Sequence, residues 1–274
     1  MKPAYKLKSS DGIDLQYYEQ TIENPKAIIC LVHGMGEHAG RYGHVADFFN
    51  SRGFSVIAFD QRGHGLSAGK KGHTPSYELL QESVLQLIQT AADKFSGVPL
   101  ILYGHSMGGN LVLNYAIRNA SGIKAVVGSS PYLHLAFNPP AWKTSLASLV
   151  KNILPGLQQD TGLDTKMLSH DEAVIKAYEA DPLVHGKITP SFFLNVHEAG
   201  NWALEHASEL KVPALVFHGT GDKITSANAT KEFAEKSGGK AQLKLWEGLY
   251  HETHNEKEYK EVLGFVADTI DQWL

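Results

Sequence analysis

The segment Leu100–Asn110, LILYGHSMGGN, places a serine among glycines at the end of an apolar run. Gly104 precedes Ser106 by two residues and Gly108 follows it by two, which is the pattern Gly-x-Ser-x-Gly. A serine exposed on a sharp strand-to-helix turn needs small neighbours, because the strained backbone brings the flanking residues too close for side chains. The apolar run before the motif and the helical pattern after it match such a nucleophile elbow, whereas an ordinary Gly-rich turn is the alternative. We predict that Ser106 is a nucleophile.

A serine hydroxyl is a weak nucleophile at neutral pH, so a base must take its proton and an acid must orient that base. At elbows of this type the chain order is serine, acid, histidine. Asp222 follows the apolar run ALVFHGTG, at the carboxyl end of a predicted strand, where open α/β sheets bind their ligands. His251 lies in the loop after the next strand, so one sheet edge could hold all three groups. We predict Asp222 as the acid and His251 as the base.

Both assignments have alternatives. Asp222 could simply end its strand in an Asx-turn. His254, three residues after His251, is a rival base, or it could help Asn255 and Glu256 begin the last helix. The segment HETH carries two histidines, but they are three residues apart, whereas the helical zinc-protease motif places them four apart. We therefore expect neither a metal nor a cofactor.

Backbone N–H groups must meet the negative charge that develops on a carbonyl oxygen when a serine attacks it. One donor at such an elbow is the residue after the nucleophile, here Met107, and the other comes from a loop after an early strand. The segment LVHGMGEH (31–38) provides that loop, with Met35 as the expected donor, unless its glycines serve only to reverse the chain. Both methionine side chains could also line an acyl pocket, because thioethers adapt to irregular apolar shapes.

Short apolar runs recur along the chain with helical patterns between them. Nearly continuous apolar strands fit a parallel sheet covered on both faces, and their alternation with helices predicts a doubly wound α/β fold. The alternating segment 11–21, DGIDLQYYEQT, predicts an antiparallel strand at the sheet edge. The other predicted strands are 27–34, 54–63, 100–106, 123–130, 214–222 and 242–248, and the predicted helices are 77–95, 109–120, 226–236 and the C-terminal segment 255–274.

The alternation of strands and helices stops after the predicted strand 123–130 and resumes at the predicted strand 214–222. This gap is too long for a bare loop in a compact domain. We expect residues 132–209 to form a small helical cap on a core domain made of residues 1–131 and 210–274. In SLASLVKNILPGL (145–157) the apolar residues share one helical face. Such a face suits a lid that receives acyl chains and makes transient contact with a membrane surface, although a helix packed on its own domain is favoured.

Composition narrows the function classes. A chain of 274 residues with 43% hydrophobic residues and a net charge of −4 fits a globular protein with a sizeable core. Without a long basic run, nucleic acid is not an expected partner, and no obligate protein partner is evident. No apolar stretch approaches the roughly 20 residues of a spanning helix, so we expect a cytoplasmic protein. The single cysteine, Cys30, is expected to be a buried free thiol.

Five segments together resemble the monoacylglycerol lipase and lysophospholipase-like branch of the α/β-hydrolase family, in its order and over most of the chain. They are HGMGEHAGRY (33–42), FDQRGHGLS (59–67), GHSMGG (104–109), DPLVH (181–185) and YHETHNE (250–256). The resemblance implies an α/β-hydrolase fold with a mainly parallel sheet, helices on both faces and a cap. It also implies the same site residues: Ser106, Asp222 and His251 as the triad, and Met35 and Met107 as oxyanion donors.

The expected activity is hydrolysis of carboxylic esters of single-chain lipids, with monoacylglycerol as the first candidate substrate and an acyl-enzyme as intermediate. A lysophospholipase, a short-chain carboxylesterase or a peptidase would use the same triad, whereas a noncatalytic binding protein on this fold would lack one of its members. Glu37, Arg41 and His254 are candidates for the polar end of the pocket. The spacing of Glu37 and Arg41 is explained equally well by a structural ion pair.

Overall fold

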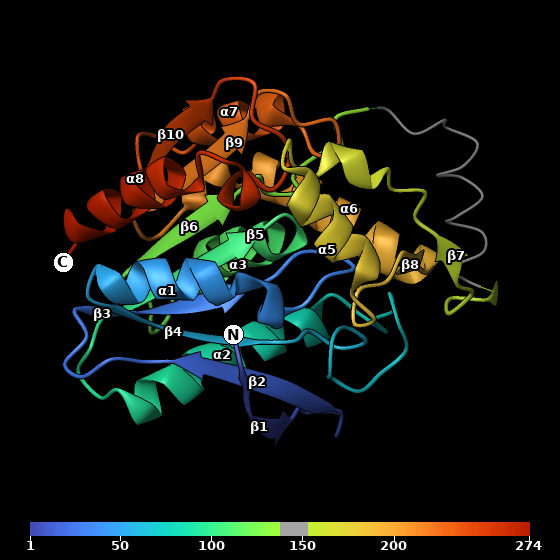
Figure 1. Cartoon of the computed structure of the whole chain (residues 1–274), viewed down its shortest axis with the longest axis horizontal. Helices are drawn as coiled ribbons and strands as arrows, with labels where there is room; N and C mark the ends of the chain where they lie inside the picture. The colour runs from blue at the N-terminus through green and yellow to red at the C-terminus, as the bar shows by residue number, and fades with distance from the viewer. Residues whose placement is uncertain (138–152) are drawn as a thin grey trace.

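The computed structural model describes residues 1–137 and 153–274 and contains an eight-stranded sheet with helices on both faces (Figure 1). The strand order is β1-β2-β4-β3-β5-β6-β9-β10. The strands from β4 to β10 in this order are parallel, while β1 and β2 form an antiparallel edge. The predicted α/β class is therefore confirmed. The strands are β1 (Pro3–Lys8), β2 (Asp14–Gln20), β3 (Ala27–Val32), β4 (Phe54–Phe59), β5 (Leu100–His105), β6 (Ala125–Ser129), β9 (Ala214–Gly219) and β10 (Ala241–Trp246).

Apolar side chains fill both faces of the central strands. Along β3, Ile28 and Cys30 point into the core on one side of the sheet, and Ile29 and Leu31 point into the core on the other side. Successive side chains of a strand face opposite ways, so the continuous apolar run AIICLV is what two covered faces require. Cys30 is free and buried, as predicted. The first face is covered by α2 (Glu78–Lys94), α3 (Met107–Arg118) and α7 (Ala227–Lys236), and the second by α1 (Gly43–Ser51) and α8 (Tyr259–Asp271).

Two elements of the core were not predicted from the sequence. Strand β1 lies at the sheet edge, and all six of its residues are exposed or half-buried, so its sequence PAYKLK carries little apolar alternation. Helix α1 follows directly on a short 3-10 turn, in a segment just after the motif at residues 33–42, for which no element was predicted. The strands and helices that were predicted for the core domain are all present, within a few residues of their expected bounds.

Between β6 and β9 the chain leaves the sheet. Figure 1 shows the elements of this segment together at the end of the molecule opposite the C-terminus. They are β7 (Gln159–Asp160), α5 (Glu172–Ala180), β8 (Lys187–Ile188) and α6 (Pro190–Glu205). Helix α6 also packs on α3, because Phe192 and Val196 belong to the same buried cluster as the residues of that helix. The bounds 132–209 for a cap remain a prediction.

Only part of the predicted lid helix 145–157 can be examined, because residues 145–152 lie outside the described ranges. In the remainder, the side chains of Ile153, Leu154 and Leu157 are exposed. Across the two described ranges, no helix has the length and apolar character needed to cross a bilayer.

Candidate active site

Ser106 occupies the turn between β5 and α3. Its backbone angles are φ 54° and ψ −116°, a combination that residues with side chains rarely adopt. The turn is held by a hydrogen bond from Ser106 N to Ser129 O at 2.9 Å and by one from Asn110 N to Ser106 O at 3.0 Å. A Cβ atom on Gly108 would overlap with the carbonyl oxygen of Val32, so this position must be glycine for space. The structure thus places Ser106 on the sharp strand-to-helix turn that the motif predicts.

Asp222 and His251 meet beyond the carboxyl ends of β9 and β10. The Oδ1 atom of Asp222 accepts hydrogen bonds from the backbone N–H groups of Ile224 at 2.7 Å and Thr225 at 3.1 Å. Its Oδ2 atom lies 2.7 Å from His251 Nδ1. The Asx-turn and the acid assignment are therefore compatible, because each uses a different oxygen of the same carboxylate.

The pKa values of this pair shift in opposite directions. Burial alone would raise the pKa of Asp222, but the charge of His251 and hydrogen bonds from His218 and His251 hold it far below its usual range. Burial acts to lower the pKa of His251, and the charge and hydrogen bond of Asp222 outweigh that effect and raise it. At neutral pH the carboxylate is therefore ionised and stabilises a proton on His251.

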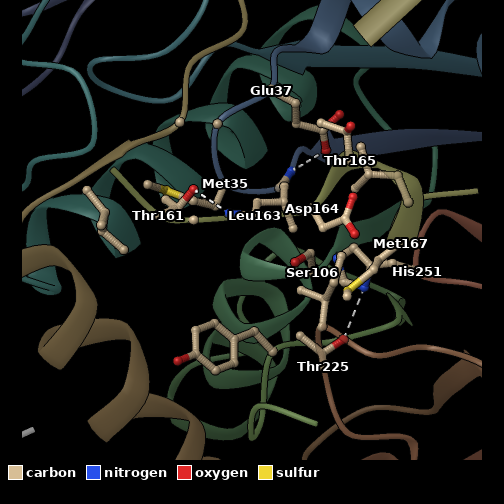
Figure 2. Close-up of a pocket in the computed structure, with 18 of the residues that line it drawn as sticks. Met35, Glu37, Ser106, Thr161, Leu163, Asp164, Thr165, Met167, Thr225 and His251 are labelled. Carbon is tan, nitrogen blue, oxygen red and sulfur yellow. Dashed lines mark hydrogen bonds between the residues drawn. The ribbon is translucent and has the colours of Figure 1, made fainter. Parts of the chain in front are cut away.

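Ser106 and His251 both line a cavity of about 1000 Å³, at the upper end of the usual range for small-molecule sites (Figure 2). In the described ranges no hydrogen bond joins Ser106 Oγ to His251, a contact that is commonly loose in enzymes until substrate binds. Much of the cavity wall is apolar. It includes Leu135, Phe137, Leu157, Leu163, Met167 and Phe193.

The two predicted oxyanion donors lie close to the serine. Met107 is the first residue of α3, and its N–H, like that of Met35, has no hydrogen-bond partner among the residues the structure describes. Gly34 lets the Met35 loop approach the elbow, since a Cβ atom on Gly34 would lie 3.2 Å from Ser106 Cβ. The side chain of Met35 lines the cavity, as expected. The side chain of Met107 instead packs in the core and is 1% exposed, so its predicted place in an acyl pocket is wrong.

A buried ion network joins the loop after β3 to the loop after β10. Arg41 Nη1 donates to Glu37 at 2.6 Å, and the Arg41 guanidinium also holds both carboxylate oxygens of Glu252 at 2.7 Å. Glu37 Oε1 accepts the N–H of Gly34 at 2.7 Å. The ion pair expected from the spacing of Glu37 and Arg41 is therefore present. Glu37 lines the cavity, whereas Arg41 lies behind it.

His254, the rival base, does not hydrogen-bond to Asp222. Its ring stacks on Tyr42 with centroids 4.9 Å apart and packs edge-on against His105 at 4.6 Å. Burial, with a smaller contribution from His105, lowers the pKa of His254 well below its usual value. Of the two candidates, the structure brings only His251 to the acid.

The chain is similar to known proteins over most of its length. The family model described as serine aminopeptidase, S33, matches residues 23–258. A monoacylglycerol lipase of Mycolicibacterium smegmatis is 34% identical over 92% of this chain and 89% of its own length. The crystal structure of the Paleococcus ferrophilus monoacylglycerol lipase has a TM-score of 0.86 and 33% identity, covering 94% of this chain and 99% of that one. The chain belongs to this α/β-hydrolase family.

The resemblance stated from the sequence is therefore confirmed, and the protein is a carboxylic ester hydrolase. An uncharacterized abhydrolase domain-containing protein of Dictyostelium discoideum is 36% identical over 90% of this chain, which spans only 26% of that protein's length. The same hydrolase unit thus also occurs within a longer chain.

Two residues that contact Asp222 were not predicted. His218 Nε2 and Thr225 Oγ1 each lie 2.9 Å from Asp222 Oδ2, and Thr225 Oγ1 is also 3.2 Å from His251 Nδ1 (Figure 2). The available signal for His218 was its position as a polar residue in the apolar run of β9, a strand whose residues are all buried. Thr225 carried no comparable signal, because it stands in an ordinary polar turn.

Glu256 fastens the His251 loop of the hydrolase to the segment before α5. The side chain of Glu256 has no exposed surface. Its Oε1 accepts from Tyr250 N at 2.8 Å and lies 2.9 Å from His170 Nδ1, while its Oε2 accepts from His170 N at 2.9 Å and Ser169 Oγ at 3.2 Å. The loop that carries His251 is therefore tied to the segment predicted as the cap.

Replacing Glu256 by glutamine should lower the free energy of unfolding by about 2 kcal/mol or more, because an amide nitrogen would face buried donors that then lack an acceptor. Denaturant unfolding followed by fluorescence measures this. Glu258→Gln is the matched control, since Glu258 is exposed in the same loop, and its effect should stay within about 0.5 kcal/mol. Equal stability of the two variants would show that the four contacts of Glu256 do not hold the loop.

Proposed function

We propose that this hydrolase cleaves monoacylglycerol to fatty acid and glycerol, with Ser106 as nucleophile, His251 as base and Asp222 as the acid that orients it. The observation that carries the proposal is the juxtaposition of the Asp222–His251 pair and Ser106 at one large, mostly apolar cavity. Its relatives from Mycolicibacterium smegmatis and Paleococcus ferrophilus are named as monoacylglycerol lipases, which supports the choice of ester.

In the proposed mechanism His251 Nε2 takes the proton of Ser106 while Ser106 Oγ bonds to the ester carbonyl carbon. The negative charge that develops on the carbonyl oxygen is met by the N–H groups of Met35 and Met107. His251 then gives its proton to the leaving glycerol oxygen as the carbon–oxygen bond breaks. Water, deprotonated by His251 in the same way, then attacks the acyl carbon. The bond from this carbon to Ser106 Oγ breaks, His251 returns the proton to Ser106 Oγ, and the fatty acid leaves.

We also propose that residues 132–209 act as the cap that receives the acyl chain. The cavity wall takes Leu157, Leu163 and Phe193 from this segment, while Ser106 and His251 come from the core. Ile153 and Leu154 come shortly before the wall residue Leu157 in sequence, and their exposed apolar side chains suit transient contact with a lipid surface. The chain length accepted by the enzyme would then depend on the cap.

Replacing Ser106 by alanine should reduce kcat by at least about a thousandfold, since nucleophile and base act as a unit. The experiment compares hydrolysis of a monoacylglycerol by wild type, Ser106→Ala and Ser121→Ala. Ser121 is exposed on a loop, so the control variant should keep the wild-type rate. Full activity in Ser106→Ala would refute the proposed nucleophile.

The value of kcat/KM should rise with pH on the acidic side of the profile, here called the acid limb. His251 accepts a proton only when it is neutral, and its pKa lies above the ordinary value of 6.5, so lowering the pH through that raised pKa removes the base. We expect the half-maximal kcat/KM of the acid limb above pH 6.5. Initial rates in overlapping buffers between about pH 5 and 9 measure this, and a profile without an acid limb in that range contradicts the role of His251.

The substrate itself is tested with monoacylglycerols, lysophospholipids and short p-nitrophenyl esters of graded chain length, each with Ser106→Ala as control. Because the cavity is large and mostly apolar, kcat/KM should be highest for medium or long monoacylglycerols. A higher kcat/KM for lysophospholipids would contradict monoacylglycerol as the substrate and favour a phospholipid headgroup. Turnover of short esters alone would keep the triad and refute a lipid substrate.

A further inference from the structure

The carboxylate of Asp222 contacts a second imidazole that the proposed mechanism does not use. His218 Nε2 lies 2.9 Å from Asp222 Oδ2, the same oxygen that lies 2.7 Å from His251 Nδ1. His218 stands in β9 with no exposed surface. Orienting His251 needs only one hydrogen bond from the carboxylate, so the second imidazole calls for a physical reason.

The surroundings of His218 determine where its proton lies. An ionised carboxylate only accepts hydrogen bonds, so His218 Nε2 must carry a proton and donate it to Asp222. The other ring nitrogen, Nδ1, lies 2.8 Å from the hydroxyl of Thr230 on α7, and that threonine is fully buried. A ring nitrogen and a hydroxyl at this distance are hydrogen-bonded, so this contact holds the His218 ring in place toward the carboxylate.

Each donor on Asp222 reduces the attraction that the carboxylate exerts on the proton of His251. Ile224 N and Thr225 N occupy Oδ1, whereas His218 and the Thr225 hydroxyl share Oδ2 with His251. A donor on Oδ2 competes directly for the lone pairs that would otherwise stabilise the imidazolium. Without it, His251 would hold its proton to higher pH and be a free base for less of the population at neutral pH.

We propose that His218 is a positioning residue that divides the charge of Asp222 between two imidazoles and thereby sets the pH at which His251 becomes a free base. This inference rests on the proposed roles of Asp222 and His251. It goes beyond them, because it assigns the position of the acid limb to a residue that touches neither substrate nor serine.

Other charged or titratable groups also face His251, and a test must leave them in place. These groups are His105 at the end of β5, Glu252 and His254 in the loop of His251, and Glu37 and Arg41 after β3. Within residues 1–137 and 153–274, no hydrogen bond or ion pair joins any of these groups to His218, so a substitution at His218 leaves their contacts intact.

The test compares His218→Leu, which removes the donor, with His218→Gln, whose amide N–H can still reach Asp222. In both variants and in wild type, kcat/KM for the fastest ester is measured against pH. His218→Leu should move the midpoint of the acid limb upward by about one pH unit, the scale of one hydrogen bond to a charged group, with the high-pH plateau within about threefold of wild type. His218→Gln should keep the wild-type midpoint within about 0.3 of a unit.

A lower plateau with an unmoved acid limb in His218→Leu would mean a purely structural role and overturn the proposal. An equal shift in the leucine and glutamine variants would overturn it as well, because the donor would then not matter. If His218→Leu does not fold, Thr230→Val provides the second variant, and its acid limb should move in the same direction. Asp222→Asn distinguishes a failure of the proposed triad from a failure of the role of His218. Retained activity in Asp222→Asn refutes the triad. If Asp222→Asn loses activity and the acid limb of His218→Leu does not move, only the role of His218 is refuted.

Discussion

The backbone of Ser106 holds a strained turn, and the neighbouring segments are packed so as to hold it there. A conformation of this kind costs of the order of 1–3 kcal/mol and persists only where its surroundings determine it. Here Ser106 O accepts hydrogen bonds from both Asn110 N and Tyr132 N, and the glycine at 108 lets the start of α3 lie against the end of β3. The same close approach brings the loop after β3 to the serine. The strain of the turn and the position of Met35 therefore have one structural cause.

Buried charge is the second constraint on the site. Arg41 donates from both terminal nitrogens of its guanidinium to the carboxylate of Glu252. Burial acts to raise the pKa of Glu252, but this bidentate pairing lowers it to about 2. Glu37 receives a single contact from Arg41, and there burial prevails and raises the pKa. Glu252 follows His251 directly, so its charge adds to that of Asp222 in favouring the imidazolium. The ion network thus holds two loops together and also favours a proton on His251.

What the sequence predicted depends on whether a feature is local. The elbow around Ser106 joins a strand, a turn and a helix that are contiguous, and Asp222 and His251 each follow a recognisable strand, so their places on one sheet edge could be inferred. The contact between Glu256 and His170 joins residues 86 positions apart, and nothing in either segment points to the other. The inward side chain of Met107 is a similar case, and the polar position of His218 in an apolar strand does not tell which group it contacts. Their roles depend on which neighbours the packed fold supplies, which no periodicity or motif encodes.

Three imidazoles gather behind the serine, and their surroundings decide which one can take a proton. His105 lies with its ring centroid 4.8 Å from that of His251 and 4.6 Å from that of His254. Burial lowers the pKa of His105 to about 3, and it lowers the pKa of His254 as well, because neither ring has a carboxylate hydrogen-bonded to it. His251 is equally buried but bound to Asp222, and its pKa is raised. In the proposed mechanism, the position of one carboxylate therefore directs the proton of Ser106 to His251, while the other two rings fill the space around it without competing for the proton.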